Sequence, residues 1–243
     1  MYAKVMSAGV AGVDGFLVEV ECDTAKGLNS MEVVGLPETA VRESRVRVRS
    51  AVVNCGYKFP SKRIIINLAP ADVPKRGTIY DVPLAVALLA ADGAIPISAL
   101  EKTLVAGELS LTGEVRPVPG ALPMTILARD QGFERIFLPA SNAREACVVE
   151  GVEVLPVKVF DEIVHHMCGE CAIEPHPYTP PDDDTDYPFD MTEIKGQEWV
   201  KEALVIAAAG SHNMLMVGPP GSGKTVSPGE HLTLCLPGAA MNS

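Results

Sequence analysis

The residues best suited to chemistry lie together in one glycine-rich octapeptide. They match G-x-x-x-x-G-K-[ST] at every fixed position and are Gly218, Pro219, Pro220, Gly221, Ser222, Gly223, Lys224 and Thr225. The glycines allow successive N–H groups to face phosphate oxygens, while Lys224 reaches the terminal phosphates and the Thr225 hydroxyl holds Mg²⁺. Residues 212–217 before the motif are mostly apolar and predict the buried strand that this loop requires. The pattern therefore predicts a site for a nucleoside triphosphate with magnesium.

Residues 226–243 do not continue this site. A phosphate loop works when a helix beginning near Lys224 points its N-terminal dipole at the nucleotide, but Pro228 and Gly229 fall in the first turns of such a helix. No acidic residue there ends an apolar strand, so the second carboxylate on the Mg²⁺ side is missing. We expect residues 226–243 to be an atypical tail, so that the nucleotide-binding module is truncated just after the motif. We also expect this chain alone to hydrolyse little or no nucleoside triphosphate.

Composition excludes several classes of protein. Hydrophobic residues make up 47% of the 243 residues and charged residues 21%, and no apolar run reaches the roughly 18 residues of a membrane span. The net charge of -11 is local, because residues 161–193 hold ten of the 31 acidic residues and no Lys or Arg. The rest of the chain has 21 acidic against 20 basic residues, so a nucleic-acid partner is not excluded. Without a signal-like N-terminus, we expect a cytoplasmic protein that does not bind membranes.

Periodicity predicts a mixed α/β chain. Alternation over residues 16–21 predicts a strand, with residues 31–34 as its partner. Helices are expected over residues 38–54, 84–91, 123–131, 160–167 and 197–209, and further strands over 64–66, 136–138 and 152–155, with a hairpin turn at residues 112–113. Asp81 is expected to cap the second helix, in which Pro83 occupies the first turn.

The stretch between residues 174 and 190 holds five prolines and five aspartates, and it predicts a linker. We therefore divide the chain into a domain over 1–172, a Pro/Asp-rich linker over 173–190, the start of a second domain over 191–225 and the tail over 226–243.

Three runs resemble the magnesium-chelatase-like YifB/ComM family of AAA+ ATPases. They are residues 35–93, 107–146 and 194–225, beginning GLPETAVRES, GELSLTGEVR and IKGQEWVKEA. The resemblance implies a domain like ribosomal protein S5 domain 2 and the Lon protease domain, followed by an incomplete P-loop (AAA+) segment. It also implies ATP and Mg²⁺ as cofactors, Ile194, Gly196 and Gln197 near the adenine, and a hexameric parent that remodels branched DNA during competence.

The resemblance to Lon protease does not extend to its Ser-Lys dyad. Ile79 stands in the place of the nucleophile, and Leu122 follows Pro119-Gly120-Ala121 where the lysine belongs. An apolar side chain can neither attack nor transfer a proton. Thr78 is adjacent, but the sequence offers it no base, so no residue is assigned a catalytic role.

Two further groups could bind ligands. Arg42, Arg45 and Arg49 recur at helical spacing and form a basic stripe that could contact DNA phosphates, or simply a solvated helix face. A cluster of histidines and cysteines could hold Zn²⁺, although a single Cys-x-x-Cys is weak support; its members are His165, His166, Cys168, Cys171 and His176. Alternative functions left open are a magnesium chelatase motor subunit, a Lon-like protease and a non-enzymatic binding module.

Overall fold

The computed structural model describes residues 1–180, 195–210, 212, 214 and 216. The chain divides into two compact units, Met1–Pro180 and Pro181–Ser243, which are treated separately below. The division falls inside the segment expected to be a linker, while the domain boundaries themselves stay a prediction.

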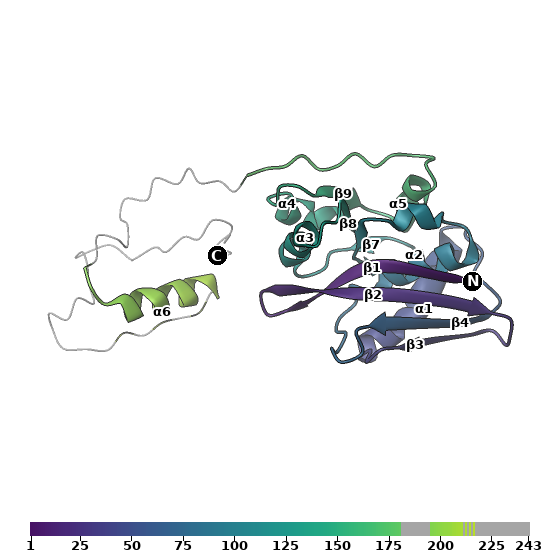
Figure 1. Cartoon of the computed structure of the whole chain (residues 1–243), viewed down its shortest axis with the longest axis horizontal. Helices are drawn as coiled ribbons and strands as arrows, with labels where there is room; N and C mark the ends of the chain where they lie inside the picture. Colours follow the sequence, from purple (N-terminus) through teal and green to yellow (C-terminus); the bar gives the residue numbers. More distant parts are fainter. Residues whose placement is uncertain (181–194, 211, 213, 215, 217–243) are drawn as a thin grey trace. The chain divides into compact units, whose positions relative to one another are not determined.

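The first unit is built on one seven-stranded sheet with the order β3-β4-β2-β1-β5-β8-β9 (Figure 1). β1 and β2 form a long antiparallel hairpin, and β2 is also antiparallel to β4. The other four neighbouring pairs are parallel. The strands are β1 Tyr2–Ala11, β2 Asp14–Ala25, β3 Ser30–Val34, β4 Arg63–Ala69, β5 Thr103–Val105, β8 Arg135–Pro139 and β9 Glu153–Val157. The expectation of a mixed α/β fold is confirmed.

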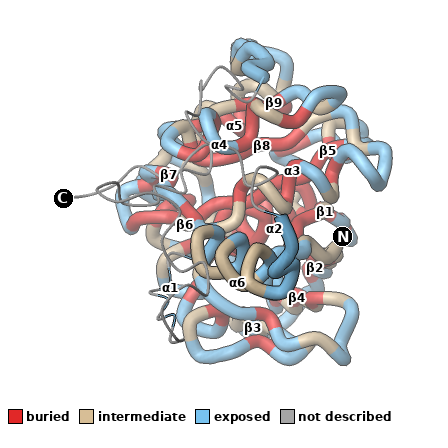
Figure 2. Tube along the Cα trace, turned by 90° about the vertical axis from the view of Figure 1, so that its left-hand side faces the viewer, coloured by how far each residue is buried: buried red, intermediate tan, exposed pale blue. Residues whose placement is uncertain are grey.

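The helices of this unit pack around that sheet. They are α1 Thr39–Asn54, α2 Asp81–Asp92, α3 Ala121–Asp130, α4 Ala143–Ala146 and α5 Phe160–Met167, with short 3₁₀ turns η1 Ile97–Leu100 and η2 Ala140–Asn142. A small hairpin joins β6 Glu108–Leu109 to β7 Val115–Arg116. Every residue of α2 from Asp81 to Ala91 is buried (Figure 2). An almost uninterrupted apolar helix is therefore the centre of the core, between α1 and the β1–β2 hairpin.

The structure corrects three local expectations. The hairpin partner of β2 is β1, which periodicity did not reveal. The buried positions of β1 include the small residues Ala3, Ser7 and Gly9, and Val5 is the strong strand former among them. β3 does not pair with β2, since β4 lies between them. Asp81 is not the cap of α2 either, because Tyr80 occupies that position and the Asp81 carboxylate faces the core.

In the second unit the structure describes one helix, α6 Glu198–Ala209, which agrees with the helix expected there. None of its residues is buried, and Trp199 and Ile206 are 74% and 61% exposed. Among the described helices, none has the length and apolar character required to cross a bilayer.

Candidate functional site

The predicted phosphate loop lies outside the described residues. This applies to all eight of its members, Gly218, Pro219, Pro220, Gly221, Ser222, Gly223, Lys224 and Thr225, and to Ile194. The magnesium role of Thr225 and the adenine role of Ile194 therefore stay predictions, and the described part of the predicted nucleotide-binding segment begins at Lys195.

Gly196 and Gln197 turn the chain into α6. Both have left-handed backbone conformations, with φ of 76° and 57°, and both are exposed. The Gln197 carbonyl accepts hydrogen bonds from the N–H groups of Val200 and Lys201 at 2.9 and 3.2 Å, so it begins the helix. Only glycine adopts such a conformation without cost, which accounts for Gly196 before α6. Their predicted contact with adenine is untested.

The three arginines of the predicted basic stripe are exposed on α1, and each has a neighbour. Arg42 donates to the Pro37 carbonyl at 3.1 Å, and Arg45 donates to the Met31 carbonyl at 3.2 Å. The Arg49 guanidinium lies 5.0 Å from the centre of the Phe59 ring, within the range of a cation–π contact. Each guanidinium has five N–H donors, so these contacts leave donors for a phosphate.

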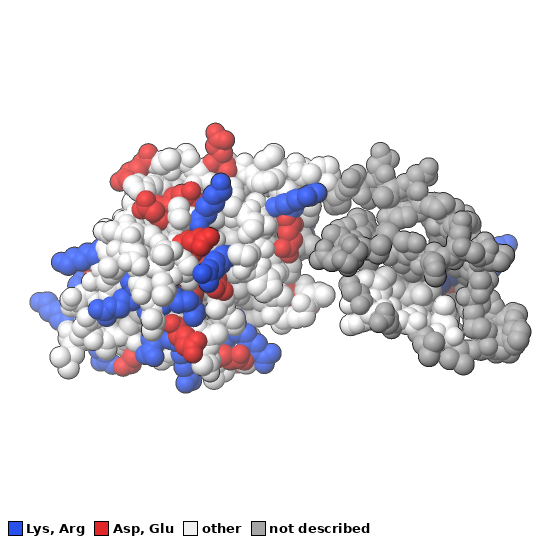
Figure 3. Space-filling view, turned by 180° about the vertical axis from the view of Figure 1, so that it is seen from behind, with Lys and Arg blue, Asp and Glu red and all other residues white. Residues whose placement is uncertain are grey.

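Lys and Arg do not form an uninterrupted basic field on the face shown in Figure 3, where Asp and Glu lie among them. A face of mixed sign is also what a solvated helix surface looks like. Contact with DNA through Arg42, Arg45 and Arg49 therefore stays a prediction.

Arg47, on the same helix, points inward instead. Its Nε and one terminal nitrogen donate to the two carboxylate oxygens of Asp81 at 2.6 and 3.0 Å. Asp81 is completely buried, and it also accepts from the Ser44 hydroxyl and from the Leu109 N–H at 3.2 Å. Hydrogen bonding to Asp81 is the main reason that the pKa of Arg47 is raised. This cluster joins α1, α2 and β6, and it leaves no lone pair of Asp81 exposed to a substrate.

The segment that resembles the Lon dyad is only partly as expected. Ile79 is 6% exposed and Ala121 is fully buried, which fits core positions. The Thr78 hydroxyl, however, donates to the Glu108 carboxylate, so the expectation that Thr78 has no acid–base partner is wrong. Glu108 also lies 3.7 Å from the Arg116 guanidinium. The Glu108 carboxylate is therefore shared between the Thr78 hydroxyl and the Arg116 guanidinium and does not serve the threonine alone.

The predicted zinc ligands do not form a metal site. Among the described residues, no group of three or more His, Cys, Asp or Glu side chains is placed to hold a metal ion. Cys168 and Cys171 are free thiols, and the Cys168 thiol donates to the Ala94 carbonyl at 3.3 Å. His165 and His166 are instead engaged with the chain that follows α5.

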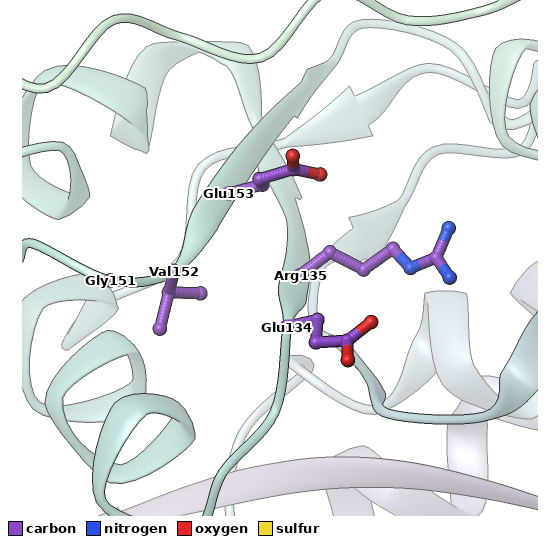
Figure 4. A pocket seen from close by; sticks show the side chains of 5 residues that line it. All are labelled: Glu134, Arg135, Gly151, Val152 and Glu153. Carbon is purple, nitrogen blue, oxygen red and sulfur yellow. The ribbon is translucent and has the colours of Figure 1, made fainter.

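Two hollows lie beside the first residues of β8. The larger, of about 560 Å³, is lined by Glu134, Arg135, Gly151, Val152 and Glu153. Figure 4 shows its three charged side chains extending to the same side, so acid and base are mixed there. The smaller hollow, of about 280 Å³, shares Arg135 and is also lined by Phe137 and His166. The larger hollow therefore lacks the convergent groups of one sign that a charged ligand requires.

Comparison with known proteins identifies the family. A family model described as "Subunit ChlI of Mg-chelatase" matches residues 20–142, and a second, "Magnesium chelatase, subunit ChlI", matches residues 190–242. The chain belongs to the magnesium-chelatase-like AAA+ family that includes YifB and ComM. The second match covers all of residues 226–242, so the expected atypical tail has more in common with the family than its residues suggested.

Members of this family align along nearly the whole chain. It is 41% identical to the "Uncharacterized protein YifB" of Escherichia coli over 91% of this chain and 44% of that protein. It is 38% identical to the "Competence protein ComM" of Haemophilus influenzae over 97% of this chain and 47% of that protein. The chain thus spans about half the length of the curated relatives it matches.

A more distant similarity accounts for the dyad-like segment. The chain is 28% identical to the Lon protease of Mycoplasma mobile over 52% of this chain and 16% of that protein. In the present chain, Ile79 and Leu122 stand where the resemblance to Lon places the two dyad residues. Sequence reasoning missed Glu108 as the partner of Thr78, because thirty positions separate them and only the β6 hairpin brings them together.

Proposed function

We propose that residues 218–225 bind ATP with Mg²⁺. The observation that carries this proposal is the complete G-x-x-x-x-G-K-[ST] octapeptide within a segment matched by the chelatase family model over residues 190–242. Its donor set fits the group, because glycine N–H groups, the Lys224 ammonium and the Thr225 hydroxyl suit phosphate oxygens and a hard cation. Ile194, Gly196 and Gln197 would lie near the adenine.

In the longer protein, ATP hydrolysis would drive remodelling of branched or single-stranded DNA by a hexamer in the cytoplasm. The support for this is the alignment with a protein named for competence, over 97% of this chain. The first unit would act as a non-catalytic module, since the positions that resemble the Lon dyad hold isoleucine and leucine.

The test uses the full-length protein and a synthetic three-way or four-way DNA junction. With MgATP, the wild type should convert the junction to products. Lys224→Ala should lower the rate at least tenfold, because it removes the positive charge that Lys224 places beside the terminal phosphates. Lys201→Ala is the matched control, since in the described part of the chain Lys201 forms its ion pair with Glu198 on α6. ATP-independent conversion, or a Lys224→Ala protein as fast as the wild type, would contradict the proposal.

A second candidate is a motor subunit of a tetrapyrrole chelatase. It is favoured by the descriptions of both matching family models, which name a magnesium chelatase subunit. This function predicts ATPase activity that rises when the porphyrin-binding partner subunits are added. No response to those subunits, together with stimulation by junction DNA, would exclude it.

A further inference from the structure

The chain that leaves α5 turns back across the first unit, and the first residues of the predicted linker belong to this segment (Figure 1). We call residues 169–179 the strap. The His176 N–H donates to the Val154 carbonyl of β9 at 2.8 Å, and the Thr179 N–H donates to the Cys147 carbonyl at 3.0 Å. The strap therefore lies along β9, an edge strand of the sheet.

The strap is held by few contacts. Ile173 is the one apolar strap residue that packs against the core cluster, and it is only partly buried. Most other strap residues are exposed. Each backbone hydrogen bond of this kind adds little net stability, because it replaces hydrogen bonds to water. Attachment of the strap is therefore sensitive to the loss of a single contact.

One of these contacts requires a neutral histidine. The Ile173 N–H donates to Nδ1 of His166 at 2.8 Å, which is possible only while Nδ1 carries no proton. The His166 ring also stands edge-on to Phe137, with centroids 5.3 Å apart. Burial, and then the charge of Arg135, lower the pKa of His166, while Glu153 opposes them. The surroundings of His166 thus favour the form that accepts from Ile173.

The contacts of the adjacent His165 require instead a protonated, positively charged ring. Nδ1 of His165 lies 2.5 Å from the carboxylate of Glu170 in the strap, and its Nε2 lies 3.1 Å from Asp161. Asp161 in turn accepts from the Tyr57 hydroxyl. The hydrogen bond to Glu170, and then the charge of Asp161, raise the pKa of His165. A protonated His165 can donate to both carboxylates at once.

We propose that attachment of the strap is a pH-dependent switch that requires His165 protonated and His166 neutral, and that it sets how much of the chain after α5 is held against the first unit. The contacts of His165 and His166 with the strap are the basis of this inference.

The sign of the effect follows from linkage. His166 contributes attachment that is present above its ordinary pKa of about 6.5 and is lost as the pH falls through its lower attached value. His165 contributes attachment that is present below about 6.5 and is lost as the pH rises through its higher attached value. Attachment is therefore strongest in a window around pH ~6.5 and weakens on both sides.

Detachment would free the eleven residues of the strap, whose contour length is about 36 Å at about 3.3 Å per residue.

The test is amide hydrogen exchange of the 243-residue chain between about pH 5 and pH 8, corrected for intrinsic rates, with nitrogen NMR of the histidine rings. Protection at Ile173 and His176 should be highest near pH ~6.5 and fall up to tenfold per pH unit on the acid side. His166→Asn keeps an acceptor in the place of Nδ1 without titrating, so it should remove the acid limb, the fall in protection at low pH. His165→Gln should remove the alkaline limb, the fall in protection at high pH.

His212→Asn is the matched control, because it removes a histidine of the second unit and should leave both limbs unchanged. Uniform protection of the strap across this pH range would overturn the proposal. So would ring spectra of the wild type that show a proton on Nδ1 of His166 near pH ~7, a reading that does not depend on any variant folding.

Discussion

The guanidinium of Arg47 donates hydrogen bonds to both carboxylate oxygens of Asp81, at 2.6 and 3.0 Å. Asp81 opens α2, whose other residues up to Ala91 are buried and largely apolar. A carboxylate in such surroundings is tolerated only when it is paired and fully hydrogen-bonded. The pair therefore fixes the position of α1 against the central helix.

Asp81→Ala should lower the free energy of unfolding by about 3 kcal/mol, because it leaves the largely buried Arg47 charge without its carboxylate. The combined change Arg47→Met with Asp81→Ala should cost less than the sum of the single changes. Urea unfolding measures both. Arg76→Ala, which breaks only the exposed pair with Glu38, is the control and should cost less than about 1 kcal/mol. Equal losses for Asp81→Ala and Arg76→Ala would show that the buried pair is unimportant.

Gly35 should not tolerate a side chain. Its φ is 95°, and a Cβ added there would lie 2.1 Å from the Leu68 carbonyl oxygen of β4. We expect Gly35→Ala to destabilise the first unit by about 3 kcal/mol, from backbone strain and displacement of a strand. Gly12→Ala also has positive φ but meets no atom within 4 Å, so it should cost only about 1 kcal/mol. Denaturant midpoints that are equal for the two variants would contradict this account.

Thr78 should not react as a nucleophile. Its hydroxyl donates to Glu108, which also lies 3.7 Å from Arg116, and neither lysine nor histidine was found among its hydrogen-bond partners in the described chain. A serine- and threonine-directed fluorophosphonate probe should leave Thr78 unmodified by mass spectrometry. Labelling of Thr78 that disappears in Glu108→Gln would restore the protease hypothesis.

The basic stripe makes a prediction about salt dependence. In the full-length protein, replacing Arg42, Arg45 and Arg49 together by glutamine should reduce the slope of log affinity against log salt by about 3, if each contacts one phosphate of duplex DNA. Glutamine keeps an amide donor for the Pro37 and Met31 carbonyls, which protects the fold. Arg129→Gln on α3 serves as the control. An unchanged slope would assign the stripe to a solvated surface.

The sequence predicted elements well where one period dominates. The alternation of β2 and the helical spacing of Val41, Val48 and Val52 in α1 match the structure closely. β1 was missed because small residues face the core there and give little hydrophobic contrast. The pairing of β3 was wrong because parallel pairing with β4 depends on a crossover, and no local residue pattern encodes it.

Side-chain partners were less predictable than elements. Asp81 looks like a helix cap from its place before Pro83, and its true partners, Ser44 and Arg47, lie on another helix. Glu108 and Thr78 meet only through the β6 hairpin. The phosphate loop is the reverse case, since its chemistry is encoded within eight consecutive residues and can be read without knowing the fold.

The most direct test of nucleotide binding is titration calorimetry of the 243-residue chain with MgATP, alongside Lys224→Ala and the control Lys201→Ala. The account predicts saturable binding by the wild type and by Lys201→Ala, at least tenfold weaker binding by Lys224→Ala, and loss of affinity when EDTA removes Mg²⁺. Equal affinity of Lys224→Ala and the wild type would contradict it.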